Sequence, residues 1–205
     1  MKIIVFGATG GVGQHVVKQA LEKGFEITAF VRTPSNLEVQ DEKLHIIQGD
    51  AFNKDDVANA IAGHDIVISC LNTSKGLEES TELEEMTKNI VDGMKAHNVN
   101  RIIYTASAGI DNEIPGPHGK KVMERLQNPL TDHRNAVKYI KSNGLTYTIV
   151  RPVGLTNDPF TGKYQETKEG VPANSHTIPR ADVAYFIIKA LTDKQYENTS
   201  VAIAT

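Results

Sequence analysis

Short apolar runs and amphipathic stretches alternate along almost the whole chain. The apolar runs are rich in Ile and Val and too short to show a helical period, which is typical of strands buried on both faces of a sheet. They predict strands at residues 2–6, 25–31, 44–47, 65–70, 101–105, 145–150 and 200–204.

Between these runs, apolar residues recur at the three- and four-residue spacing of a helix face. This spacing predicts helices around Val16–Leu21 and at 54–62, 81–97, 120–127, 130–142 and 180–191. Prolines and a glycine predict a loop at 110–118 that could act as a substrate lid. Residues 152–178 are expected to be irregular, with a short extended piece near 163–167.

The alternation of strands and helices predicts an α/β fold, a doubly wound parallel sheet of Rossmann type with ligands at the carboxyl ends of its strands. No internal repeat or linker divides the 205 residues, so 1–205 is expected to be a single domain. Residues 1–110 would form the cofactor half, and 107–180 would contribute the substrate edge.

Between the first strand and the first helix the chain reads Gly7-Ala8-Thr9-Gly10-Gly11-Val12-Gly13. Gly7 allows a sharp turn, Gly10 lets backbone N–H groups approach a diphosphate, and Gly13 lets the helix pack close to the strand. The phosphates would lie at the positive end of that helix. The alternative is a glycine-rich turn that binds nothing. The predicted dinucleotide-binding residues here are Gly7, Thr9, Gly10, Gly11, Val12 and Gly13.

The end of the second strand indicates which dinucleotide binds. Chains that select NAD usually carry Asp or Glu there, to bind the ribose hydroxyls. This chain carries Arg32, followed by Thr33. A guanidinium can hold a 2′-phosphate with two charge-assisted hydrogen bonds, so the sequence predicts NADP(H). The alternative is that Arg32 is only a solvated charge at a strand end.

Residues that follow the other strands would complete the cofactor site, because the carboxyl ends of parallel strands share one edge of the sheet. Asp50 could accept a hydrogen bond from the adenine amino group. The residues expected beside the cofactor at these strand ends are Asp50, Ala51, Leu71, Asn72 and Ser107.

Dehydrogenases of this architecture usually carry a Tyr-x-x-x-Lys pair on the helix before the sixth strand. Here that helix has Tyr139 followed four residues later by Asn143, so the pair is absent. Two matches elsewhere are interpreted as coincidental. Tyr164 and Lys168 lie in an extended stretch, where this spacing does not bring side chains together. Tyr185 and Lys189 lie on the last helix, where Tyr185 is expected to pack against the core.

The catalytic candidates are therefore Ser107 and His133. Ser107 leaves the fifth strand where the nicotinamide should lie, and its hydroxyl could bind a substrate carbonyl or the carboxamide. Its alternative role is to satisfy a turn. His133 is positioned as a proton donor, and its alternative is a solvated helix position. Asp132, beside it, could complement a helix start.

Composition narrows the remaining function classes. A formal net charge of −3 gives no electrostatic footprint for nucleic acid. Cys70 is the only cysteine and no Cys/His cluster has metal-site spacing, which indicates a reducing compartment and no metal. No long apolar segment suggests a membrane span or a leader. We therefore expect a cytoplasmic protein that binds neither nucleic acid nor a membrane. Its expected partner is a small-molecule acceptor, and a monomer or a small homo-oligomer both fit the sequence.

Several further motifs carry a family resemblance that runs nearly end to end. They are Phe6-Gly-Ala-Thr-Gly-Gly-Val-Gly13, Val31-Arg32, Gly49-Asp50, Asn89-Ile-Val, Met94-Lys-Ala-His97, Thr105-Ala-Ser-Ala108, Ser142-Asn-Gly-Leu145 and Thr161-Gly-Lys-Tyr164. With them the chain resembles the atypical short-chain dehydrogenases/reductases of the NAD(P)-binding, NmrA-like type, and most closely their flavin reductase and biliverdin reductase B branch.

The resemblance implies an NADPH-dependent oxidoreductase that transfers a hydride to a flavin, quinone or tetrapyrrole-like acceptor without the Tyr-x-x-x-Lys pair. It implies that Arg32 holds the 2′-phosphate and that Ser107 lies beside nicotinamide and substrate; His133 also has a counterpart. One departure concerns the loop after the sixth strand, where those reductases carry a histidine and this chain has Gly154.

Two other functions fit the same sequence. One is a non-catalytic NADP(H)-binding redox sensor that acts through a protein partner, as NmrA-type regulators do. The other is an epimerase or dehydratase, which the short chain and the missing Tyr-x-x-x-Lys pair disfavour.

Overall fold

The computed structural model describes residues 1–205, and its main sheet has eight strands in the order β3-β2-β1-β4-β5-β6-β10-β8. All neighbouring strands are parallel except β8, which pairs antiparallel with β10. The strands of this sheet are β1 (Lys2–Phe6), β2 (Glu26–Val31), β3 (Leu44–Gln48), β4 (Ile66–Ser69), β5 (Arg101–Thr105), β6 (Thr146–Pro152), β8 (Gln165–Thr167) and β10 (Thr199–Ala204). This is the doubly wound α/β fold that the sequence predicts.

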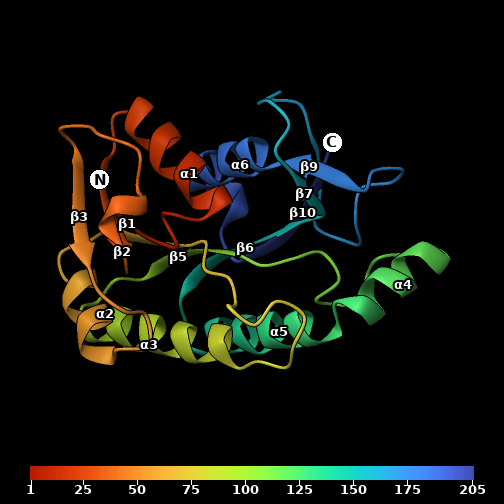
Figure 1. The fold of residues 1–205 in the computed structure, drawn as a ribbon, viewed down its shortest axis with the longest axis horizontal. Coiled ribbons are helices and arrows are strands. Elements are labelled where there is room, and N and C mark those ends of the chain that lie inside the picture. Colours follow the sequence, from red (N-terminus) through yellow and green to blue (C-terminus); the bar gives the residue numbers. More distant parts are fainter.

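Helices cover both faces of the sheet (Figure 1). α1 and α6 pack on one face and α2, α3 and α5 on the other, while α4 projects beyond the sheet. The helices are α1 (Gly11–Glu22), α2 (Lys54–Ile61), α3 (Glu82–Ala96), α4 (Gly116–Arg125), α5 (Gln127–Ser142) and α6 (Arg180–Thr192). None of them combines the length and the apolar character needed to cross a membrane.

The strands alternate their side chains between two cores. Ile3 and Val5 of β1 belong to the core beneath α1 and α6, whereas Ile4 and Phe6 belong to the core beneath α2, α3 and α5. All four side chains are fully buried. A strand that contributes to both cores must be apolar at each buried position, which is why β1 shows no polar alternation from Ile3 to Phe6.

The segment around α4 differs from the sequence-based prediction. The loop expected at 110–118 ends earlier, because α4 begins at Gly116 with Pro117 in its first turn. α5 begins at Gln127, before the expected start at Leu130, with Pro129 in its first turn. Proline is tolerated in a first turn, where its missing N–H would have no partner. The prolines therefore mark helix starts here, not a longer loop.

Residues 152–178 are more regular than expected. A second, two-stranded parallel sheet pairs β7 (Gly154–Thr156) with β9 (Thr177–Pro179). These strands are three residues long, too short for a hydrophobic period to show them. The extended piece expected near 163–167 is strand β8. It pairs with β10, the last strand of the chain, and forms the antiparallel edge of the main sheet.

The strand order reverses between β1 and β4, whose crossovers lie on opposite faces of the sheet. In open α/β sheets such a switch point leaves a crevice at the carboxyl ends of the two strands. The glycine turn after β1 and the residues after β4 meet at this crevice, so the fold brings them together.

Candidate functional site

The glycine turn packs against neighbouring backbone so closely that two of its positions exclude any side chain. Gly7 has φ +76°, and a Cβ on it would lie 2.5 Å from the Cys70 carbonyl oxygen. A Cβ on Gly13 would lie 2.0 Å from the Gly7 carbonyl oxygen. Gly7 therefore permits the turn beside β4, and Gly13 permits α1 to start close to β1.

The start of α1 presents backbone donors that no protein group satisfies. The first i→i−4 hydrogen bond of the helix runs from the Gln14 N–H to the Gly10 carbonyl at 2.9 Å. The N–H groups of Gly11, Val12 and Gly13 have no acceptor in the protein, and no side chain caps the helix. Free N–H groups at the positive end of a helix form a ready anion site. Beside them, the Thr9 carbonyl accepts a bond from the Gln14 side chain.

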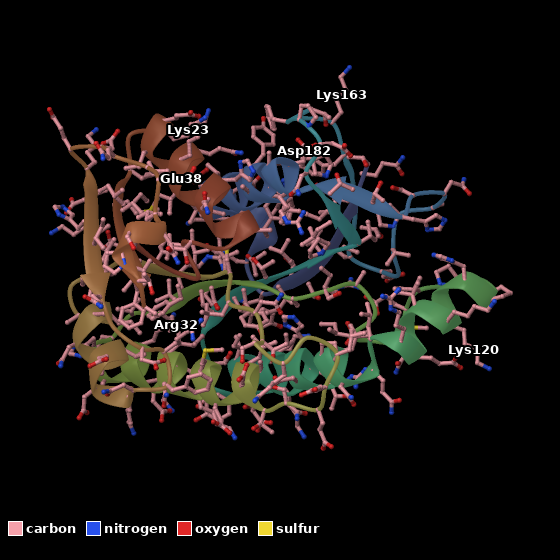
Figure 2. The ribbon with its side chains drawn as sticks, viewed as in Figure 1. Lys23, Arg32, Glu38, Lys120, Lys163 and Asp182 are labelled. Carbon is pink, nitrogen blue, oxygen red and sulfur yellow. The ribbon has the colours of Figure 1, made fainter.

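Arg32 and Thr33 follow β2 and are exposed to solvent. The Arg32 guanidinium makes no ion pair or hydrogen bond within the protein, and only its carbonyl is used, by the Gln48 side-chain amide at 3.2 Å. Arg32 is labelled in Figure 2. A cation with no carboxylate partner at this strand end is free to bind an anionic group of a ligand.

Asp50 and Ala51 follow β3, the strand beside β2. The Asp50 carboxylate accepts the Phe52 N–H at 3.0 Å, which fixes the turn after the strand. Ala51 is buried, and its carbonyl accepts the Asn89 side-chain amide at 3.0 Å. Asn89, from a motif of the resemblance, thus ties this turn to α3.

A cleft of about 710 Å³ opens at the carboxyl ends of the central strands. Seven of the residues singled out from the sequence line it: Gly10, Gly11, Val12, Leu71, Asn72, Ser107 and His133. The other seven, which lie outside its lining, are Gly7, Thr9, Gly13, Arg32, Thr33, Asp50 and Ala51. The structure therefore brings the start of α1 and both catalytic candidates into one cavity.

The outer part of this cleft is largely apolar. Its walls come from the loop after β4, the segment around α4 and the segments after β6 and before β9. The apolar side chains that line it are Leu77, Ile114, Pro115, Val122, Leu126, Pro129, Leu130, Val153, Leu155, Val171 and Pro172. Cys70 also lines it, but burial raises the pKa of this thiol to about 12, so it stays protonated at neutral pH.

Ser107 lies at the floor of the cleft, half-buried, in the turn after β5. Its hydroxyl donates to the Ala108 carbonyl at 3.0 Å. The Ala108 N–H in turn donates to the Pro152 carbonyl at 2.9 Å, which holds this turn against β6. The Ser107 oxygen keeps its lone pairs for a ligand donor.

His133 is buried on the inner face of α5 and is not a solvated helix position. Its Nδ1 lies 3.0 Å from the Tyr104 hydroxyl of β5. Burial lowers the pKa of His133 to about 4, so the imidazole is neutral at physiological pH. A neutral imidazole donates one hydrogen bond, but it does not carry the extra proton of an imidazolium.

The neighbouring Asp132 is also buried, and it serves a different helix from its own. Its two carboxylate oxygens accept the N–H groups of Leu83 and Glu84 at 3.0 and 2.9 Å. Asp132 therefore caps the start of α3 and fixes α5 against it.

Arg180, the first residue of α6, lines the cleft and was not identified from the sequence. It lies flat on the glycine turn: a Cβ on Gly11 would lie 2.7 Å from its Cδ and Nε atoms. Its Nη1 donates to the Asn157 side-chain oxygen at 2.8 Å. The guanidinium therefore stands beside the free N–H groups of α1. Arg180 is far from the glycines in sequence and belongs to no motif that singles it out.

Gly154 occupies the position at which the reductases of the resemblance carry a histidine. A Cβ on Gly154 would lie 2.8 Å from the His176 carbonyl oxygen, so pairing of β7 with β9 leaves no room for a side chain. His176 itself lines the cleft, with its ring centroid 4.9 Å from that of His118. Two imidazoles thus stand in the cleft beside the apolar wall.

Neither of the other Tyr-x-x-x-Lys matches lines the cleft. The Tyr164 ring packs edge-on against Phe186, and Lys168 donates to the Gln195 carbonyl. The expectation that Tyr185 packs against the core is wrong. The residue is 38% exposed, and its ring contacts that of Phe160, itself exposed on the surface.

Comparison with known proteins places the chain in a family. The model of the family described as NAD(P)H-binding matches residues 7–194. An uncharacterised chloroplast protein of Arabidopsis thaliana is 29% identical over an alignment of 213 positions. The alignment covers 95% of this chain and 73% of that protein. Two other curated relatives are much longer, and the matched region covers 28% and 32% of their lengths.

Two solved structures share the fold. A short-chain dehydrogenase/reductase from Veillonella parvula, solved in complex with NADP, has a TM-score of 0.85 at 23% identity, covering 100% of this chain and 94% of that one. ChuY, an anaerobillin reductase from Escherichia coli O157:H7, has a TM-score of 0.81 at 21% identity, covering 100% and 97%. With residues 7–194 matched, the chain belongs to the NAD(P)H-binding family, on a fold that it shares with short-chain dehydrogenases/reductases.

Proposed function

We propose that this protein is an NADPH-dependent reductase that transfers a hydride to a conjugated acceptor of the flavin, quinone or tetrapyrrole type. One observation carries the proposal. A single cleft joins the free N–H groups at the start of α1 to an apolar chamber that contains Ser107 and His133. A dinucleotide anchored by its diphosphate at α1 would extend its nicotinamide toward that chamber.

Arg32 supports the preference for the phosphorylated coenzyme. Its guanidinium has no partner in the protein and stands at the end of β2, where the adenosine ribose lies in this architecture. Thr33, next in the chain, adds a hydroxyl donor. A carboxylate at this position would instead repel a 2′-phosphate.

The side chains of the cleft would orient the reactants and exclude water. NADPH supplies the hydride, so the protein needs to add only binding, orientation and electrostatics. Ser107 would hold the carboxamide or the acceptor at the floor, and the apolar wall would cover a flat acceptor and lower the local dielectric constant. The wall carries no carboxylate that would oppose the negative charge developing on the acceptor as it takes the hydride.

The test is to mix the protein with NADPH and FMN, then with 1,4-naphthoquinone and with biliverdin, while following absorbance at the nicotinamide band. The proposal expects protein-dependent oxidation with at least one acceptor, faster with NADPH than with NADH. Tight NADP(H) binding without oxidation by any acceptor would contradict it and favour a redox sensor that acts through a protein partner. The absent Tyr-x-x-x-Lys pair is the observation that keeps this second function open.

A further inference from the structure

A buried phenol and an imidazole form a hydrogen-bonded pair that reaches from β5 to the cleft. The Tyr104 side chain is fully buried in the sheet, and His133 of α5 lies beside it. The Tyr104 hydroxyl lies 3.0 Å from His133 Nδ1. Tyr104 lines no part of the cleft, whereas His133 does.

The direction of this hydrogen bond follows from the chemistry of the two groups. A phenol is a stronger donor than a neutral imidazole, and a ring nitrogen is the stronger acceptor of the two. Tyr104 therefore donates to Nδ1, and the imidazole proton is carried by Nε2.

Nε2 faces an open space. It makes no hydrogen bond within the protein. It is not fully enclosed either, because the only fully buried side-chain polar atom without a partner is Ser69 Oγ. Since His133 lines the cleft, Nε2 is open toward it.

We propose that Tyr104 fixes the tautomer of His133 so that Nε2–H points into the cleft as a permanent neutral donor to a carbonyl oxygen of the acceptor. This inference rests on the proposed reductase function. As a quinone takes a hydride from NADPH, an electron pair moves onto its carbonyl oxygen, and the Nε2–H bond stabilises that charge until water supplies a proton. The balance is quinone plus NADPH plus H⁺ giving hydroquinone plus NADP⁺. His133 is the group that touches the acceptor, and Tyr104 is a positioning residue.

The tautomer can be read without any substrate. Nitrogen NMR of protein labelled with ¹⁵N-histidine distinguishes a protonated ring nitrogen from a bare one. We expect the His133 signals to show hydrogen on Nε2 and none on Nδ1. Tyr104→Phe should shift the ring toward a mixture of both tautomers. Tyr139→Phe should change nothing, because it removes a hydroxyl of the same helix that donates to Asp92 of α3 and not to His133. A proton on Nδ1 in the unmodified protein would overturn the proposal.

Two isosteric variants test the catalytic consequence. Gln places its amide nitrogen near the position of Nε2, and Asn places its own near Nδ1. With 1,4-naphthoquinone as the probe, we expect His133→Asn to lose about 10- to 100-fold in kcat and His133→Gln to lose clearly less, with the Kd for NADPH unchanged in both. Equal kcat values for the two variants would contradict the proposed donor.

The two levels of the proposal fail differently. If none of the acceptors supports oxidation of NADPH by the unmodified protein, the reductase function is wrong, and with it the catalytic use of Nε2–H. If it turns over but the NMR shows hydrogen on Nδ1, the reductase function stands and the role of Tyr104 is wrong.

Discussion

Arg32 and Arg180 would hold different phosphates of the same dinucleotide. Arg180 lies on Gly11 beside the free N–H groups of α1, so its charge should act on the diphosphate, which NADPH and NADH share. We expect Arg180→Ala to raise the Kd of both coenzymes by the same factor, about tenfold, because charge-assisted hydrogen bonds are lost. Titration calorimetry with both coenzymes measures this. A change confined to NADPH would place Arg180 at the 2′-phosphate instead.

His133 makes stability depend on pH. Its pKa is about 4 in the folded protein and 6.5 in the reference state, so between these values the unfolded chain binds a proton that the folded chain does not. Acid therefore favours unfolding in this window. From pH 7 to pH 5 the protein should lose about 2 kcal/mol more free energy of unfolding than His133→Gln. Urea unfolding at both pH values measures the difference, and equal losses would show that His133 is not buried as a neutral ring.

At the scale of the strand-turn-helix element, two glycines have separable roles. A Cβ on Gly13 would lie 2.0 Å from the Gly7 carbonyl oxygen, whereas one on Gly10 would lie 3.2 Å from the same atom. Gly13→Ala must push α1 away from β1 and should cost about 3 kcal/mol or more. Gly10→Ala should cost within about 1 kcal/mol, yet raise the Kd of NADPH at least about tenfold, by placing a methyl group against the diphosphate.

Thermal unfolding and calorimetry on the two alanine variants check this separation. If Gly10→Ala bound NADPH as tightly as the unmodified protein, the diphosphate would not lie on this turn. If Gly13→Ala kept full stability, the close start of α1 would not be a packing requirement.

The elements that the sequence predicts well are those whose burial imposes a pattern. β1 is apolar from Ile3 to Phe6 and β4 from Ile66 to Ile68 because they contribute to both cores, and α3 shows its stripe because one face lies against the sheet. β7 and β9 were missed because three-residue strands have no period. The start of α4 was misplaced because proline is compatible both with a loop and with a first helical turn.

At the scale of the whole molecule, one buried ion pair joins the loops that wall the cleft. Arg151, 2% exposed, pairs with Glu113 before α4 and donates to the Lys168 and Gly170 carbonyls after β8. Its Nε donates to the Ser200 hydroxyl of β10 at 2.9 Å. One guanidinium thus ties two loops that are distant in sequence to the sheet.

Removing this guanidinium should be costly, because it leaves a buried carboxylate and several carbonyls without a donor. We expect Arg151→Met to lower the free energy of unfolding by about 3–5 kcal/mol. Adding Glu113→Leu should recover part of the loss, since the unpaired charge is then gone. Urea unfolding of the two single variants and the double variant measures the coupling. Strictly additive losses would mean that the pair does not join the loops.

In the candidate site, too, a local sequence pattern predicts some of the residues and not others. Gly10, Gly11 and Ser107 were found because they follow strands, and the topology sends all carboxyl ends to one edge. Arg180 and Tyr104 were not found, since their roles depend on contacts between distant segments. A tyrosine inside a fully buried strand does carry one usable signal: its hydroxyl needs a partner.

The most direct test of the account is calorimetric titration of NADPH and NADH into the unmodified protein, Arg32→Ala and Lys23→Ala. Lys23, exposed at the end of α1 and away from Arg32 in Figure 2, controls for the loss of one positive charge. We expect NADPH to bind at least about tenfold more tightly than NADH, and Arg32→Ala alone to abolish that preference. No heat with either coenzyme well above micromolar concentration, or an unchanged ratio in Arg32→Ala, would contradict the account.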